Sequence, residues 1–244
     1  MGILSNLDTD NLEQTEDKVT GTSTGSFVVD SDIYLATIKR AYLVQSQSSK
    51  AQAMSLILTL PDDKEHRETI YFSSKEGLPY KLSDNGARKP LLGFNTINDL
   101  CMLTTEVPLK DQVTEEKKIA IWDNNAKEEV PQFVNVFTDL EGKQVYVALL
   151  KVIANKRKKD GNEYVNSEEK TTFNRIDKFM HYDQKVTLSE AIKGKDAKFY
   201  DEWLKEWKGK DKDEYKTVTS SGTRPTASST PTTRKAGTSL FNKN

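Results

Sequence analysis

The imidazoles of His66 and His181 and the thiol of Cys101 are the first candidates for acid–base or nucleophilic chemistry in this sequence. His66 lies within a run of charged residues (63–67) that is typical of a solvated turn, and His181 follows a predicted strand, where an edge position is favoured. Cys101 comes next to Leu100 on the apolar face of a predicted helix, which favours a buried, inert thiol. An acyl-transfer triad needs a nucleophile, a base and an orienting group within hydrogen-bonding reach. The sequence predicts no such triad.

Metal-dependent hydrolysis is the enzymatic alternative that we keep. Pro61-Asp62 and Glu141-Gly142-Lys143 resemble the Pro-Asp and Glu-x-Lys elements with which many restriction-type nucleases hold a divalent ion and activate water. Here both groups coincide with predicted turns, whereas the Glu and Lys normally belong to an apolar strand. The sequence has no Gly-rich phosphate loop of the GxGxxG or GxxxxGK[ST] type. We therefore expect no enzymatic activity, no metal site and no cofactor, with a magnesium-dependent nuclease as the alternative.

Cations and aromatic side chains interleave along the predicted strands, a pattern that suits single-stranded nucleic acid. Cations neutralise phosphates, and flat rings stack on exposed bases at roughly 1–3 kcal/mol per base. The candidate contact residues are Lys39, Arg40, Tyr42, Lys50, Tyr71, Phe72, Tyr80, Lys81, Arg88, Lys89, Lys151, Lys156, Arg157, Lys158, Lys159, Tyr164 and Arg175. Lys156–Lys159 is the densest positive cluster, and four consecutive cations repel one another unless an anion neutralises them. Core packing is the alternative reading of each ring.

The elements that carry these residues are mostly strands. Ile33–Leu60 contains two β-rich runs around a polar stretch (45–50), as in a β-hairpin, and a third run covers residues 68–72. Apolar residues spaced for one face of a helix follow Pro90, and Pro108 ends that helix. Two further short strands are expected at residues 117–122 and 133–137.

The longest predicted strand runs from Gln144 to Lys159, turns at Asp160-Gly161 and returns through residues 163–179. A short amphipathic helix follows, in which Phe199, Trp203 and Trp207 recur every four residues. This order predicts a mainly β fold: a small β-barrel with one central helix and a short C-terminal helix.

Charge is segregated along the 244-residue chain, although 36 Lys and Arg nearly balance 37 Asp and Glu. Residues 1–20 carry five acids and one base, and residues 217–244 carry four bases and no acid. We expect a flexible acidic arm (1–24), one folded domain (25–208) and a disordered, basic, Ser/Thr-rich tail (209–244). A single cysteine excludes an internal disulfide, and no apolar run approaches the roughly 20 residues of a membrane span. The N-terminal stretch also lacks the pattern of a signal peptide, so we expect a soluble, cytoplasmic protein.

The order of these segments resembles single-stranded DNA-binding proteins of short-tailed lytic bacteriophages. The resemblance covers residues 26–179 and is most distinctive in GLPYK (77–81) and in the helix of residues 93–105. It implies an OB-type barrel that coats single-stranded DNA without strong sequence preference during phage replication and recombination, in the host cytoplasm. Phage replication, recombination or transcription proteins are the expected partners of the C-terminal tail.

The tail departs from the usual pattern of this class, which ends in acidic residues and a terminal aromatic. Here Leu240 and Phe241 are followed by a basic end, GTSLFNKN. The tail is therefore expected either to dock a protein partner or to contact DNA itself. The acidic arm could occupy the basic groove when DNA is absent and so compete with DNA. A structural or scaffold phage protein is the remaining non-enzymatic alternative.

Overall fold

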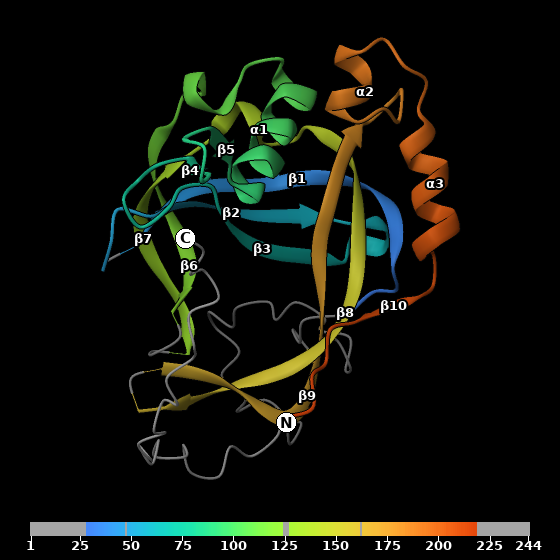
Figure 1. Ribbon diagram of the computed structural model, residues 1–244. Helices are drawn as coiled ribbons and strands as arrows, with labels where there is room; N and C mark the ends of the chain where they lie inside the picture. The colour runs from blue at the N-terminus through green and yellow to red at the C-terminus, as the bar shows by residue number, and fades with distance from the viewer. Residues whose placement is uncertain (1–27, 47, 124–126, 162, 219–244) are drawn as a thin grey trace, which may run out of the picture. The chain divides into compact units, whose positions relative to one another are not determined.

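The computed structural model describes residues 28–46, 48–123, 127–161 and 163–218, and the fold is mainly β (Figure 1). The chain divides into two compact units. The first includes the described residues up to 153 and residues 172–213; the second, which we call the arm, includes residues 154–171 and 214–218. The predicted acidic N-terminal segment (1–24) and most of the predicted tail lie outside the described residues.

The secondary structure agrees with the predicted order of elements and adds several short ones. The strands are β1 (Asp32–Gln45), β2 (Gln52–Thr59), β3 (Glu65–Tyr71), β4 (Tyr80–Leu82), β5 (Arg88–Pro90), β6 (Glu115–Asp123), β7 (Glu128–Val136), β8 (Gln144–Asp160), β9 (Glu163–His181) and β10 (Asp211–Asp213). The helices are α1 (Leu92–Thr105), α2 (Leu188–Ile192) and α3 (Lys198–Trp207). The two predicted hairpins, the central helix and the C-terminal helix are confirmed.

Strand β1 organises the sheet because it pairs along both of its edges. Its first half, residues 32–37, pairs with β8, and residues 37–45 pair with β2, which in turn pairs with β3. β9 pairs with β8, and the β6–β7 ribbon joins β1 through the single pair Tyr42 and Val136. β4 and β5 form a separate two-stranded sheet.

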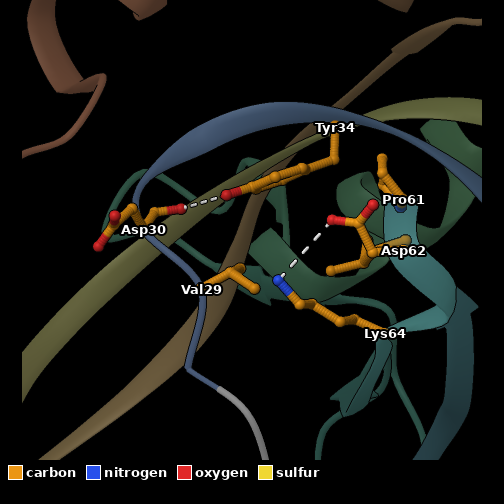
Figure 2. Close-up of a pocket in the computed structure, with 7 residues that line it drawn as sticks. Val29, Asp30, Tyr34, Pro61, Asp62 and Lys64 are labelled. Atoms are coloured by element: carbon orange, nitrogen blue, oxygen red, sulfur yellow. Dashed lines mark hydrogen bonds and ion pairs between the residues drawn. The ribbon is translucent and has the colours of Figure 1, made fainter.

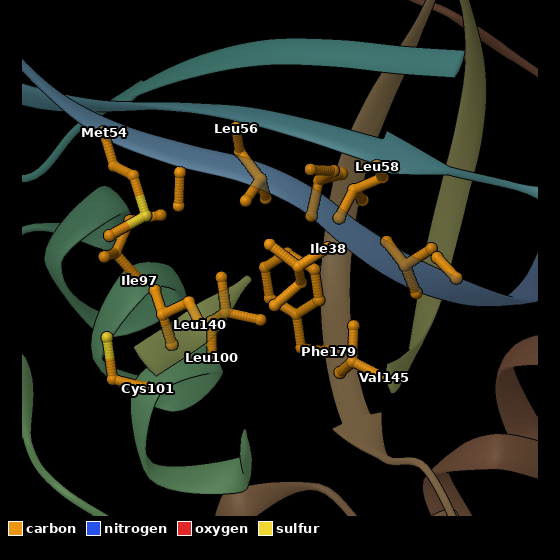
Figure 3. Close-up of a cluster of buried hydrophobic side chains, with 14 of the residues drawn as sticks. Ile38, Met54, Leu56, Leu58, Ile97, Leu100, Cys101, Leu140, Val145 and Phe179 are labelled. Carbon is orange, nitrogen blue, oxygen red and sulfur yellow. The ribbon is translucent and has the colours of Figure 1, made fainter. Parts of the chain in front are cut away.

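The core lies between α1 and the strands of the first unit. Figure 3 shows Phe179 of β9 in the middle of this cluster, beside Ile38 of β1 and Val145 of β8, and all three are fully buried. α1 contributes Leu100 and Cys101, as its apolar spacing predicts. Close packing at its first turn requires Gly93, because a Cβ there would lie 2.0 Å from the carbonyl oxygen of Tyr71.

The sheet does not close into the predicted barrel. Among the described residues, backbone pairing stops at β3 on one side and at β9 on the other. A side chain bridges this gap instead: the Glu68 carboxylate on β3 accepts a hydrogen bond from the backbone N–H of Ile176 on β9 at 2.8 Å. A side chain of β3 thus makes the contact with the β9 backbone that a main-chain carbonyl would make in a closed barrel.

Two side-chain contacts fasten the C-terminal helix α3 to the sheet. The Trp203 indole Nε1 donates to Asp177 of β9 at 2.7 Å, and Trp203 is 4% exposed. The ring of Tyr200 packs edge-on against that of Tyr146 on β8, with 5.6 Å between centroids, and the Lys185 ammonium lies 4.7 Å from the centroid of Tyr200. The predicted docking of this helix on the sheet is confirmed.

Order continues beyond the predicted domain boundary at residue 208, so that boundary is corrected. β10 adds to the sheet in parallel with residues 151–153 of β8. The short, charged run DKD has no strand pattern in its sequence. It forms a strand because the edge of β8 is free to pair with it. No helix in the described part of the chain is both long and apolar enough to cross a membrane.

Candidate nucleic-acid interface

Three hairpins each hold a cation over an aromatic ring, which is half-buried in the first and exposed in the other two. In β4–β5 the Arg88 guanidinium lies 4.8 Å from the Tyr80 centroid. In β6–β7 the Lys118 ammonium lies 5.9 Å from the centroid of Phe133, which is 68% exposed. In the arm, Arg157 lies 5.9 Å from the centroid of Tyr164, which is 61% exposed. A ring beside a cation matches the two parts of a nucleotide, a flat base and a phosphate.

The arm contains the cluster of four cations predicted from the sequence. Lys156 is held by Glu169 at 2.9 Å, a hydrogen bond that lowers the pKa of the Glu169 carboxyl. Arg157 donates to the backbone carbonyl of Tyr164 at 2.8 Å, which orients its guanidinium along the hairpin. Lys158 and Lys159 are exposed. The cluster therefore consists of two fixed and two solvent-facing cations beside one open ring.

Residues 214–216 lie along the arm, a placement that sequence reasoning missed. The buried Asn155 side chain accepts from the Lys216 backbone N–H and donates to the Lys216 carbonyl, both at 2.8 Å. The Tyr215 hydroxyl donates to the Glu168 carbonyl at 3.1 Å, and Lys170 lies over the Tyr215 ring. The Asn155 side chain thus pairs with the backbone of Lys216 as a neighbouring strand would, and holds this segment against the arm.

A second group of cations occupies one face of β1–β2–β3. The register pairs Arg40 with Ile57 and Ile57 with Arg67, so the two guanidinium groups share a face two strands apart. Lys39 and Arg67 both bind the carboxylate of Glu65, and these hydrogen bonds lower the pKa of Glu65. Sequence reasoning missed Arg67 because the residues around it read as a turn.

Two more acids neutralise this face. The Glu141 carboxylate lies 3.5 Å from Arg40 Nε, and that of Glu129 on β7 lies 3.8 Å from Arg67. Each cation of the face therefore has a carboxylate where a phosphate could bind.

The remaining predicted contact residues divide into exposed and buried ones. Lys50, Lys81 and Lys89 are exposed, and Tyr71 is 53% exposed on the same sheet face as Arg67. Arg175 is half-buried on β9.

Three predicted residues have structural roles instead. Tyr42 and Phe72 are each only 9% exposed, so the prediction that they offer free ring faces is corrected. Strand alternation could not assign these positions, because burial depends on neighbours far away in the sequence, such as Val136 of β7, the ladder partner of Tyr42. Lys151 is bound by Asp30 at 3.2 Å and Asp211 at 3.4 Å, and these hydrogen bonds raise its pKa. It fastens β8 to the chain segments on either side.

The two acidic residues of the nuclease alternative, Asp62 and Glu141, each lie beside a cation of the protein. Figure 2 shows Asp62 among the residues that line a cavity of about 240 Å³, with its carboxylate 4.0 Å from the Lys64 ammonium. Glu141 is engaged by Arg40. Within the described ranges, no group of three His, Cys, Asp or Glu side chains is arranged to hold a metal ion.

The two histidines have structural hydrogen bonds. His66 is 8% exposed on β3, not in a solvated turn as predicted, and its Nε2 donates to the Glu68 carboxylate at 3.0 Å. Its burial follows from strand alternation, which turns it toward the interior while Arg67 faces outward. His181 Nδ1 accepts from the backbone N–H groups of Asp183 and Gln184 at the end of β9, the predicted position.

Cys101 is fully buried, and burial raises the pKa of its thiol to about 12. We expect an aromatic disulfide reagent at pH 8 to label the folded protein at least roughly tenfold more slowly than the urea-unfolded chain, because only the thiolate attacks. The measurement is the release of the coloured thiol over time in both states. Equal rates would place Cys101 at the surface.

Compared with known proteins, the chain matches no family model and no curated sequence.

Proposed function

We propose that the protein is a non-catalytic, largely sequence-independent single-stranded DNA-binding protein that acts in phage DNA replication and recombination. The observation that carries the proposal is the repeated pairing of an aromatic ring with a cation on the hairpins β4–β5, β6–β7 and β8–β9, with exposed rings on the last two. Stacking on rings and ion pairing with phosphates recognise features that every nucleotide shares. Equal affinities for oligonucleotides of unrelated sequence are therefore expected, and a preference of more than about tenfold would contradict the proposal.

The strand order supports an OB-like architecture for this function. The order β3–β2–β1–β8–β9, with α1 between β3 and β8 in the sequence, matches a five-stranded OB barrel with its helix before the fourth strand. In such folds the second and third strands and two loops bind oligonucleotides, and the barrel is commonly partly open. By this correspondence Arg67 and Tyr71 lie on one of the binding strands. Lys50 lies in the first binding loop, between β1 and β2, and the arm takes the place of the second binding loop, between β8 and β9.

The carboxylates on the sheet face would act as internal competitors for phosphate. Glu65 holds both Lys39 and Arg67, so each must leave it to contact DNA. We expect Glu65→Gln to bind poly-dT about threefold more tightly at low salt, because a neutral amide releases the two cations. Fluorescence anisotropy with a labelled oligonucleotide measures the change.

Glu206→Gln is the matched control, since it removes the same charge from an exposed position on α3. It should leave the affinity within about 1.5-fold of the wild type at the same salt, because a charge outside the proposed contact residues acts on DNA only through its long-range field, which salt screens. Equal tightening by both variants would show that only net charge matters and that Glu65 is no competitor.

The tail is proposed as the contact for phage replication, recombination or transcription proteins. Residues 214–216 support this because they attach the start of the tail to the arm. Partners bound to the tail would then lie close to DNA bound by the arm.

A further inference from the structure

The β6–β7 ribbon carries an exposed apolar face. This face includes none of the DNA-contact residues that were predicted from the sequence. The register pairs Lys118 with Phe133, Ala120 with Pro131 and Trp122 with Glu129. Directly opposed residues share one face of an antiparallel pair, and all six are exposed. Trp122 is 50% exposed and Phe133 is 68% exposed, which is unusual for rings of this size.

The opposite face of the ribbon is less exposed, so the exposed rings belong to one side of the ribbon. Ile119, Ile121, Val130 and Val134 are half-buried there. The strands therefore alternate between a covered aliphatic face and an open aromatic one. An aromatic face left open to solvent marks a binding surface.

The dimensions of the open face suit a short run of nucleotides. Trp122 lies four residues along β6 from Lys118, the partner of Phe133, which corresponds to about 13 Å along the strand. Between the two rings lie only Ala120 and Pro131, whose short side chains leave the face flat. Two separated rings on a flat face can each stack with one base of an extended strand.

The charges on this face favour a nucleotide over an apolar protein segment. The Lys118 ammonium lies over Phe133, where it can reach the phosphate of a base stacked on that ring. Glu129 is neutralised by Arg67 from β3, which also brings the ribbon beside the cation face of the sheet. Glu116 is the remaining acid on the face and lies at its far end from Trp122.

We propose that this face of the β6–β7 ribbon is a base-stacking site for single-stranded DNA, with Trp122 and Phe133 as the stacking rings and Lys118 as the phosphate contact. The inference rests on the proposed function and adds a site outside the predicted contact residues. It also assigns a role to β6 and β7, which are additional to the five strands of the OB-like order.

Tryptophan fluorescence tests this site directly, because the chain has three tryptophans in different surroundings. Trp203 is 4% exposed and Trp207 is half-buried, so Trp122 is the most accessible. Poly-dT should quench the emission of the wild type and of Trp207→Phe. Trp122→Phe should lose most of the quenching while it keeps its affinity within about threefold, because phenylalanine still stacks.

Removal of the rings should then weaken binding. Phe133→Leu and Trp122→Ala are each expected to lower the affinity for poly-dT about tenfold. Tyr182→Leu removes a ring that is 50% exposed at the end of β9 and should leave the affinity unchanged. Circular dichroism and thermal melts of each variant confirm that it is folded.

Two other outcomes separate the failure of this site from the failure of the function. If poly-dT binds the wild type but Trp122 emission is unmoved and the ring variants bind normally, the ribbon is no DNA site and its apolar face belongs to a protein contact. If the wild type does not bind poly-dT at all, the proposed function itself fails, and this inference with it.

Discussion

Replacement of Lys156, Arg157, Lys158 and Lys159 together by alanine is expected to weaken binding to poly-dT more than 100-fold at low salt. Each phosphate contact on a single strand contributes about 0.7 to the slope of log affinity against log salt. Two to four lost contacts should therefore flatten the slope by roughly 1.4 to 2.8. The loss should be similar for oligonucleotides of unrelated sequence, because backbone contacts carry no base information.

The control for this variant removes the same charge elsewhere. Lys193, Lys195, Lys205 and Lys210 are all exposed in the region of α2, α3 and the segment after them. Their joint replacement by alanine should change the salt slope by less than about 0.5, since cations outside the proposed contact residues act on DNA only through screened attraction. If the arm variant keeps the wild-type slope, or if the control flattens it equally, the arm is not the main phosphate contact.

Glu68→Ala is expected to lower the free energy of unfolding by about 2–3 kcal/mol. Its carboxylate accepts from the Ile176 N–H and from His66 Nε2, and it is the link that we find across the opening between β3 and β9. Removal of the acceptor leaves a largely buried imidazole and a backbone N–H without a partner, and each unsatisfied buried group costs about 1–3 kcal/mol. Urea unfolding followed by circular dichroism measures the loss.

Two variants make this test specific. Glu68→Gln keeps an acceptor oxygen and should lose only about 1 kcal/mol. Glu202→Ala on the exposed side of α3 should stay within about 0.5 kcal/mol of the wild type. If Glu68→Ala is as stable as Glu202→Ala, the hydrogen bond between Glu68 and Ile176 does not hold β3 and β9 together.

Local pattern predicted most of the elements because their signals are contained in a few residues. The alternation in β1 and β2, the apolar spacing in α1 and the Asp160-Gly161 turn each specify a local conformation; Gly161 has the left-handed φ of +59° that the turn requires. Helix α2 was missed although Thr187 and Glu190 form a capping box, because it is only five residues long.

Long-range contacts explain what the sequence did not predict. Across the opening of the sheet, Glu68 binds Ile176, which is 108 residues away in the chain, and β10 pairs with the edge of β8. No local pattern encodes either contact. The covered positions of Tyr42 and Phe72 are likewise consequences of tertiary packing.

The candidate interface was predictable in its residue types but not in its geometry. The clustered cations of the arm and the ring of Tyr164 were predicted by their composition. Trp122 and Phe133 were missed because an alternating strand does not reveal which of its faces is covered. The exposed face of the ribbon became visible only through the pairing of β6 with β7.

The measurement that tests the central proposal most directly is a titration of the protein against fluorescent poly-dT and a matched duplex. It is made from about 50 mM to about 500 mM salt, with and without magnesium, and the DNA is inspected afterwards. We predict tighter binding to the single strand, an affinity that falls steadily with salt, and intact DNA in every sample. Magnesium-dependent cleavage that is lost in Asp62→Ala, or no binding to the single strand even at the lowest salt, would contradict the proposed function.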